Sequence, residues 1–195
     1  MQLYGTLLLL PAAVLLAAFA YLPTITTLIN SLFLPGFRGA PAEFAGVENY
    51  QILFDNPTFW KVASNNLIYA LGTIPTSIAL ALGMALFVNG KLPGRGLVRM
   101  AYFTPTILPM IAAANIWMFF YAPQIGLLNG LLDTLGFSGI NWLGDPSIAL
   151  GSVIVMSVWK EAGFFMIFYL AALQSIPPEL KEASDLEGTS RWSFF

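Results

Sequence analysis

Long stretches without a charged side chain dominate this sequence, and polar residues gather between them. A membrane-spanning helix needs about 20 mostly apolar residues. We expect transmembrane helices near residues 3–33, 62–88, 100–121 and 147–172. The pattern predicts an all-α, polytopic membrane protein, with one transmembrane domain over residues 1–195 and a polar segment at 175–195 outside the bilayer.

The first stretch contains Pro11 and Pro23, and we expect both to kink the helix, which membrane helices tolerate. Its "AAFA" is spaced like a signal-peptide cleavage site. However, its apolar run is far longer than the ~15 residues of a signal peptide and lacks a basic start. A membrane helix is the better interpretation.

The second stretch contains small residues four positions apart, a spacing that lets two helix backbones approach closely. The pairs are Ala79 with Gly83 and Ala81 with Ala85. We expect helix packing here and no chemistry.

The composition supports the membrane interpretation. The chain is 57% hydrophobic and 9% charged, whereas a soluble domain carries about 25% charged residues. Its net charge of −2, without a basic run, gives no indication of a nucleic-acid partner. The absence of cysteine and histidine removes thiolates, the commonest general base and the commonest metal ligand. We expect no metal site and no cofactor.

Basic residues in short loops predict the orientation. The loop 89–99 contains three basic residues and no acidic one, whereas 122–146 contains Asp133 and Asp145 and no basic residue. The loop 89–99 is therefore expected in the cytoplasm. With four spans, both termini are expected there too.

The two outer loops carry structural signals. The stretch 46–67, "GVENYQILFDNPTFWKVASNNL", mixes aromatic and polar residues as an interfacial helix does. In "NWLGDPSIAL", we expect Trp142 at the interface, Asp145 as N-cap of the fourth span and Pro146 in its first turn. "GLLNG" at 126–130 has GxxxG spacing but lies in a predicted loop. An aromatic belt or a docking surface for an external partner would explain these stretches.

Nucleotide and catalytic motifs are absent from the sequence. "GKLPGRG" lacks the order of a phosphate-binding P-loop, and neither GxSxG nor HExxH occurs. We expect no catalytic residue. If the protein uses ATP, another polypeptide binds it.

Lys160 and Glu161 interrupt the fourth stretch. Ionisable side chains are costly inside a membrane unless they face a cavity or a partner, and adjacent residues point about 100° apart on a helix. The pair either bonds to polar groups on neighbouring helices or lines a polar pathway. Asn65, Asn66 and Asn115 are further candidates for such a pathway.

The closing segment, 175–195, predicts a second kind of helix. Pro177 and Pro178 end the fourth span and can start a new helix, in which Glu179 and Glu182 suit the positive N-terminus. A narrow apolar stripe at i, i+3 and i+6 is formed by Leu180, Ala183 and Leu186.

A glycine ends this polar helix. We expect Gly188 in the left-handed C′ conformation, and Ser190 as the cap of a short helix beginning at Arg191. The result is a helix–turn–helix elbow on the cytoplasmic side, or otherwise an amphipathic connector.

"EASDLEG" within this elbow resembles the EAA signature of permease subunits of binding-protein-dependent ABC importers. The preceding "LAALQSIPPELKEA" is similar to the approach to that signature in the carbohydrate-uptake class. So are "ENYQILF", "RMAYFTPTILP", "GLLNGLL", "WLGDP" and "VWKEAGF", in the family order. The resemblance covers nearly the whole chain.

Matching positions assign the signature to this sequence. Glu182, Ala183 and Gly188 carry it, and Ser184 stands where a second alanine is usual. Glu187 stands where an aspartate is common, and Thr189 where an alanine is common. By resemblance, this segment couples the permease to an ATPase subunit.

The resemblance implies a subunit of the translocation pathway in a prokaryotic inner membrane, without a catalytic site of its own. Its implied partners are a second permease, two cytoplasmic ATP-binding cassette subunits and an extracytoplasmic solute-binding protein. The implied cargo is a sugar, oligosaccharide or sugar-alcohol phosphate. Family members continue past the signature through further spans, so we expect a C-terminally truncated chain.

Two other classes remain open on the residues alone. A secondary transporter would need a coupling-ion site and often shows internal repeats. No internal repeat is detected in this sequence. A membrane-embedded enzyme would need converging titratable groups.

Overall fold

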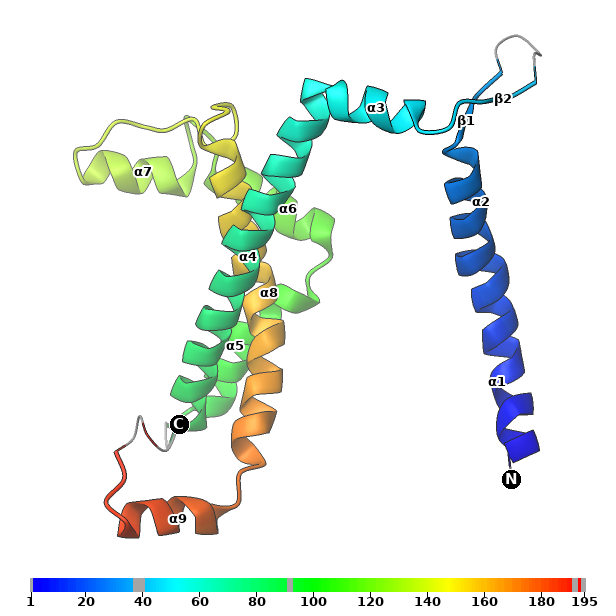
Figure 1. The fold of residues 1–195 in the computed structure, drawn as a ribbon. Helices are drawn as coiled ribbons and strands as arrows, with labels where there is room; N and C mark the ends of the chain where they lie inside the picture. The colour runs from blue at the N-terminus through cyan, green and yellow to red at the C-terminus, as the bar shows by residue number, and fades with distance from the viewer. Residues whose placement is uncertain (1, 37–40, 91–92, 191–192, 194–195) are drawn as a thin grey trace. The chain divides into compact units, whose positions relative to one another are not determined.

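The structure, a computed structural model, describes residues 2–36, 41–90, 93–190 and 193 (Figure 1). The chain divides into two units, residues 1–64 and 65–195, which we describe separately. Within the described residues it is helical apart from one short strand pair, β1 (Phe33–Leu34) with β2 (Glu43–Phe44). Three helices are long and apolar enough to span a membrane, and a bent pair can form a fourth span. The predicted all-α, polytopic membrane protein is confirmed.

The first span is a run of three helical segments in the first unit. They are α1 (Gln2–Leu16), the π-helix η1 (Ala17–Tyr21) and α2 (Leu22–Asn30). The π-helix ends two residues before Pro23, whose missing N–H disrupts an ordinary α-helical ladder. Thr24 Oγ1 donates to the Ala20 carbonyl at 2.7 Å, so this side chain supplies a local hydrogen bond.

A short helix after the strand pair is bound to the end of α2. Asn49 on α3 (Glu48–Asp55) donates from Nδ2 to the carbonyls of Ser31 at 2.8 Å and Phe33 at 3.0 Å. The hydroxyls of Ser31 and Tyr50 are 2.7 Å apart. The helix α3 occupies part of the aromatic, polar stretch identified in the sequence, and it lies crosswise to α2 in Figure 1.

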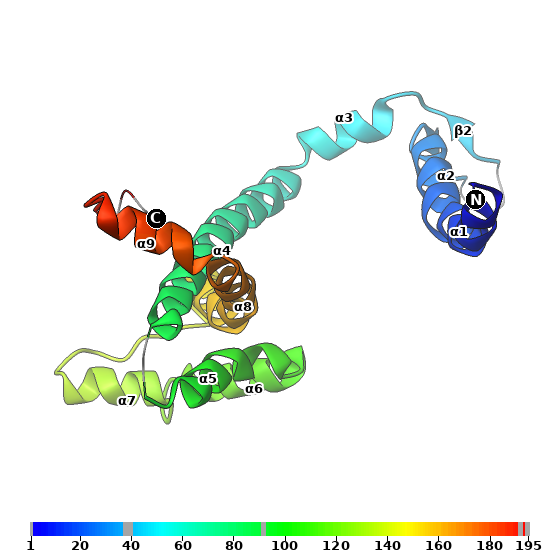
Figure 2. The same cartoon turned by 90° about the horizontal axis from the view of Figure 1, so that it is seen from below.

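The core of the second unit lies between two long helices, α4 (Pro57–Asn89) and α8 (Ala149–Gln174), which are neighbours in both views (Figure 1 and Figure 2). Its buried apolar cluster consists of Ala81, Ala85, Val88, Met166 and Leu170. Of the two small-residue pairs, Ala81 and Ala85 are fully buried, whereas Ala79 and Gly83 are exposed. One pair therefore belongs to the buried core of this chain, and the other does not.

The span expected near 100–121 is two helices, α5 (Arg95–Ile107) and α6 (Met110–Phe120), bent by 102°. Leu108 and Pro109 between them are extended. Proline has no N–H to donate and disfavours a helical conformation in the residue before it. Pro109 was visible in the sequence, but the continuous apolar run around it predicted a single span.

Two expectations about the loop 122–146 are wrong. The segment 126–130 is not a loop, because α7 (Leu127–Thr134) begins there. Asp145 is not the N-cap of α8, which begins at Ala149 after Ile148. Instead, Asp145 Oδ1 accepts bonds from the Ser147 hydroxyl at 2.7 Å and the Ser147 N–H at 2.9 Å, which lower the pKa of this carboxyl. These bonds form a separate turn before the helix.

The burial of Ala85 between α4 and α8 can be tested by substitution. Replacing Ala85 by Leu forces a larger side chain into the cluster with Met166 and should destabilise the chain by about 1–3 kcal/mol. The same replacement at exposed Ala79 is the matched control and should change little. Thermal unfolding in detergent measures both, and equal shifts would contradict the packing.

Candidate functional site

The polar helix α9 (Pro178–Leu186) begins as the sequence predicts. Pro178 is its first residue and Pro177 is the extended N-cap. Glu179 lies in the first turn, where the helix dipole favours an acid. Glu182 is four residues into the helix, so its expected place at the N-terminus is wrong.

A Schellman turn closes this helix. Gly188 has a φ of +68°, its N–H donates to the Asp185 carbonyl at 3.3 Å, and the Thr189 N–H donates to the Ser184 carbonyl at 3.1 Å. The predicted left-handed Gly188 is confirmed. A Cβ added there would meet no atom within 4 Å, so a side chain would strain only the backbone.

The helix expected from Arg191 lies outside the described residues, apart from Ser193. The Ser193 N–H donates to Ser190 Oγ at 3.2 Å, in the geometry of an N-cap.

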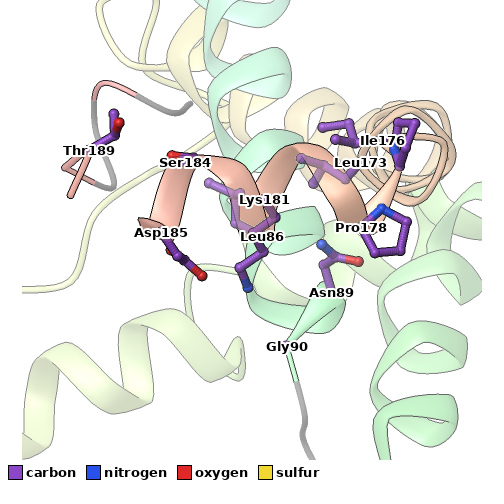
Figure 3. A pocket seen from close by; sticks show the side chains of 11 residues that line it. Leu86, Asn89, Gly90, Leu173, Ile176, Pro178, Lys181, Ser184, Asp185 and Thr189 are labelled. Carbon is purple, nitrogen blue, oxygen red and sulfur yellow. The ribbon is translucent and has the colours of Figure 1, made fainter. Parts of the chain in front are cut away.

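One face of α9 borders a groove of about 790 Å³ that the ends of α4 and α8 also line (Figure 3). Lys181, Ser184 and Asp185 lie on this face, and Asn89 and Leu173 are on the opposite walls. Ser184, the variant position of the signature, is half-buried there.

The other face of α9 is exposed. At 100° per residue, the stripe of Leu180, Ala183 and Leu186 points away from the groove, and Glu182 lies at its edge. Leu180 is 58% and Leu186 89% exposed. The signature residues therefore have different surroundings: Glu182 and Ala183 are exposed, whereas Ser184 faces the groove. Glu187 is the C-cap.

Lys160 bonds to a neighbouring helix. Its Nζ donates to the Thr106 carbonyl on α5 at 3.3 Å, and Thr106 Oγ1 donates to the Lys160 carbonyl at 3.0 Å. Both Lys160 and Glu161 are half-buried. Within the described residues, the side chain of Glu161 has no hydrogen bond or ion pair. The structure thus gives the two neighbours different surroundings.

The three asparagine candidates differ from this pair in burial. Asn65, Asn66 and Asn115 are exposed within this chain. Their place in a pathway stays a prediction.

Sequence reasoning missed a polar seam between α4 and α8. The Tyr69 hydroxyl donates to Ser157 Oγ at 2.8 Å, and the latter donates to the Val153 carbonyl at 2.9 Å. Thr73 Oγ1 and Ser77 Oγ are buried on the same face of α4 without a hydrogen-bond partner in the described structure. The four-residue spacing of Tyr69, Thr73 and Ser77 was the available signal.

Asn129 organises the loop between α6 and α8, which the sequence did not predict. Its Nδ2 donates to the carbonyls of Pro123 at 3.0 Å and Ile140 at 2.9 Å. Its Oδ1 accepts from the Ile140 N–H at 3.0 Å and from Trp142 Nε1 at 2.9 Å. Asn129 is 7% exposed, and all four bonds fix the loop around it.

This loop is joined to α8 through Ser152. Ser152 Oγ donates to the Trp142 carbonyl at 2.8 Å, and the Tyr121 hydroxyl donates to the Ser152 carbonyl at 2.8 Å. The ring of Tyr121 also lies 5.7 Å from that of Trp142 and 5.1 Å from that of Trp117. The loop, the end of α6 and the start of α8 therefore form one packed structure, named below the Asn129 lobe (residues 121–152).

These features define a multi-pass helical membrane protein with a capped polar helix at one end of α8 and the Asn129 lobe at the other. Residues 74–195 match the model of the family described as "Binding-protein-dependent transport system inner membrane component". The chain belongs to this family.

Curated relatives are similar over nearly the whole chain. The sulfoquinovosyl glycerol transport system permease protein of Agrobacterium fabrum is 36% identical over 97% of this chain and 62% of its own length. The trehalose/maltose transport system permease protein of Thermococcus litoralis is 32% identical over 98% of this chain and 65% of its own length. The chain thus spans less than two thirds of these relatives.

A solved structure is also similar. It is the crystal structure of a bacterial ABC transporter involved in the import of the acidic polysaccharide alginate, with a TM-score of 0.79 at 26% identity. The match covers 98% of this chain and 64% of that chain.

The Asn129 lobe can be tested by removing its central amide. Asn129→Ala leaves the Trp142 indole and the Ile140 backbone without their partner, at a cost of about 1–3 kcal/mol for each buried group left unpaired. Limited proteolysis should then cut within 123–147 faster than in the parent chain. Asn141→Ala, which removes one exposed bond to the Gly144 N–H, is the control. Equal protection in both variants would contradict the role of Asn129.

Proposed function

We propose that this chain forms part of the translocation pathway in the permease subunit of an ATP-driven, binding-protein-dependent importer. The observation that carries the proposal is the capped helix α9, which presents Ala183 and Glu182 of the signature on an exposed face. Family membership supports it. The subunit itself catalyses no reaction, and its partners hydrolyse ATP.

The proposed cargo is a sugar, an oligosaccharide or a sugar-alcohol phosphate. The support comes from relatives named for sulfoquinovosyl glycerol, trehalose or maltose, and lactose transport. The proposed pathway includes Glu161, Asn65, Asn66 and Asn115.

The proposed partners are a second permease, two ATP-binding cassette subunits and an extracytoplasmic solute-binding protein. A similar transporter has been crystallised with an alginate pentasaccharide-bound periplasmic protein. In this chain, the exposed apolar stripe of α9 supports docking to an ATPase subunit, because a stripe of this kind is otherwise unfavourable in water.

The proposed orientation puts α9 and the loop 89–99 in the cytoplasm and the Asn129 lobe outside. The groove brings the C-terminal ends of α4 and α8 together with α9, which supports one common side for them. The Asn129 lobe adjoins the opposite end of α8. The basic residues of 89–99 then select the cytoplasmic side.

Cysteine labelling tests this orientation. The chain has no native cysteine, so Asp133→Cys and Arg95→Cys each introduce one thiol. In intact cells, an impermeant thiol reagent should label the residue at 133 and leave the residue at 95 unlabelled. Labelling at 95 under the same conditions would overturn the proposed topology.

Two substitutions of Gly188 test the coupling role. In the complete permease, Gly188→Val should cost roughly 1 kcal/mol or more in the left-handed turn and weaken ATPase association and uptake. Gly188→Asn is the matched control, since asparagine tolerates this conformation better. Co-purification of the ATPase and cargo-stimulated hydrolysis measure the effect. Normal association and uptake in the valine variant would leave α9 a simple connector.

A further inference from the structure

The break between α5 and α6 leaves backbone groups without their usual helical partners. In an uninterrupted helix, the Thr106 carbonyl would accept a bond from the Met110 N–H, four residues later. Here Met110 begins a helix that turns away by 102°. The alternative donor three residues later is missing too, because Pro109 has no N–H, and the Leu108 N–H bonds to the Pro105 carbonyl at 3.3 Å. In a bilayer, no water is available to replace the lost donor.

The Lys160 ammonium supplies a donor at this position. Its bond to the Thr106 carbonyl lies at the C-terminal end of α5, where the helix dipole is negative and a cation is favourable. The Thr106 hydroxyl bonds in return to the Lys160 carbonyl. Two hydrogen bonds therefore join α8 to the residue just before the break.

Close backbone contact makes this pair of bonds possible. Gly163, one turn along α8 from Lys160, lies against the carbonyl oxygen of Tyr102, one turn back along α5 from Thr106. A Cβ at position 163 would collide with that oxygen. The absence of a side chain at Gly163 thus brings the two helices near enough for Lys160 to bond to Thr106.

We propose that Lys160 is a positioning residue that fixes the angle between α5 and α6, and that it does not bind cargo. Its side chain satisfies a carbonyl of the protein, whereas the neighbouring Glu161 has no partner among the described residues and is free for a polar pathway. The assignment depends on the geometry of the break and holds whether or not the transport proposal is correct.

Distance measurements across the break test this assignment. Leu97 on α5 and Met118 on α6 are exposed, and both can be replaced by Cys and spin-labelled in the otherwise cysteine-free chain, held in lipid nanodiscs. The parent chain should give a narrow distribution of distances by electron–electron double resonance. Lys160→Met should shift or broaden it, because methionine keeps an unbranched side chain without the ammonium.

Two further variants make the test specific. Lys160→Arg keeps a cationic donor and should give the same narrow distribution as the parent chain. Glu161→Gln is the matched control for the loss of an adjacent charge and should leave the distances unchanged. An unaltered distribution in Lys160→Met, or an equal broadening in Glu161→Gln, would overturn the assignment.

Assembly itself provides a readout if Lys160→Met fails to insert. Recovery of a folded chain by Lys160→Arg would support a required cationic donor, and failure of both variants would overturn the assignment. In the assembled importer, Lys160→Met should lower the maximal uptake rate without changing the half-saturating cargo concentration. A change confined to the half-saturating concentration would identify a cargo ligand and reject the proposal.

Discussion

Backbone hydrogen bonding in the absence of water is the constraint on which the irregular parts of this structure depend. A bilayer cannot solvate a free carbonyl, so each departure from an α-helix requires a local substitute. Just before Pro23 the chain widens into a π-helix, and Thr24 bonds to the Ala20 carbonyl. At Pro109 a whole helix changes direction, and Lys160 bonds to a carbonyl at the end it leaves. The first departure is solved locally, while the second requires a side chain from more than fifty residues away.

Features determined locally could be predicted from the sequence, whereas features determined by helix packing could not. Apolar length gave the spans, because hydrophobicity is summed over many residues. Proline and glycine at the ends of α9 gave both of its boundaries, since their effects are local. The partner of Lys160 could not be predicted, because it is determined by how two helices pack. Asn129 was missed for the same reason: the four groups that it bonds come from Pro123, Ile140 and Trp142, which only the folded lobe brings together.

The structure also separates residues that the linear sequence groups together. Lys160 and Glu161 are adjacent, yet one bonds to α5 and the other has no such bond in the described structure. Ala183 and Ser184 are adjacent in the signature, yet one is exposed and the other borders the groove. Adjacent residues of an α-helix are rotated by about 100° around its axis, which is enough to give the two members of each pair different surroundings. Chemical similarity along the sequence is therefore a weak guide to shared roles in this chain.

The uninterrupted length of α8 has a mechanical consequence. This helix contains 26 residues, which at 1.5 Å per residue corresponds to a rod of about 39 Å. Ser152 bonds one end to Trp142 of the Asn129 lobe, and at the other end Pro177 and Pro178 start α9. A tilt of about 5° pivoting at the lobe would displace the far end of such a rod by roughly 3 Å. A small rocking movement on one side of a membrane would thus become an ångström-scale displacement on the other, without any change in the helix itself.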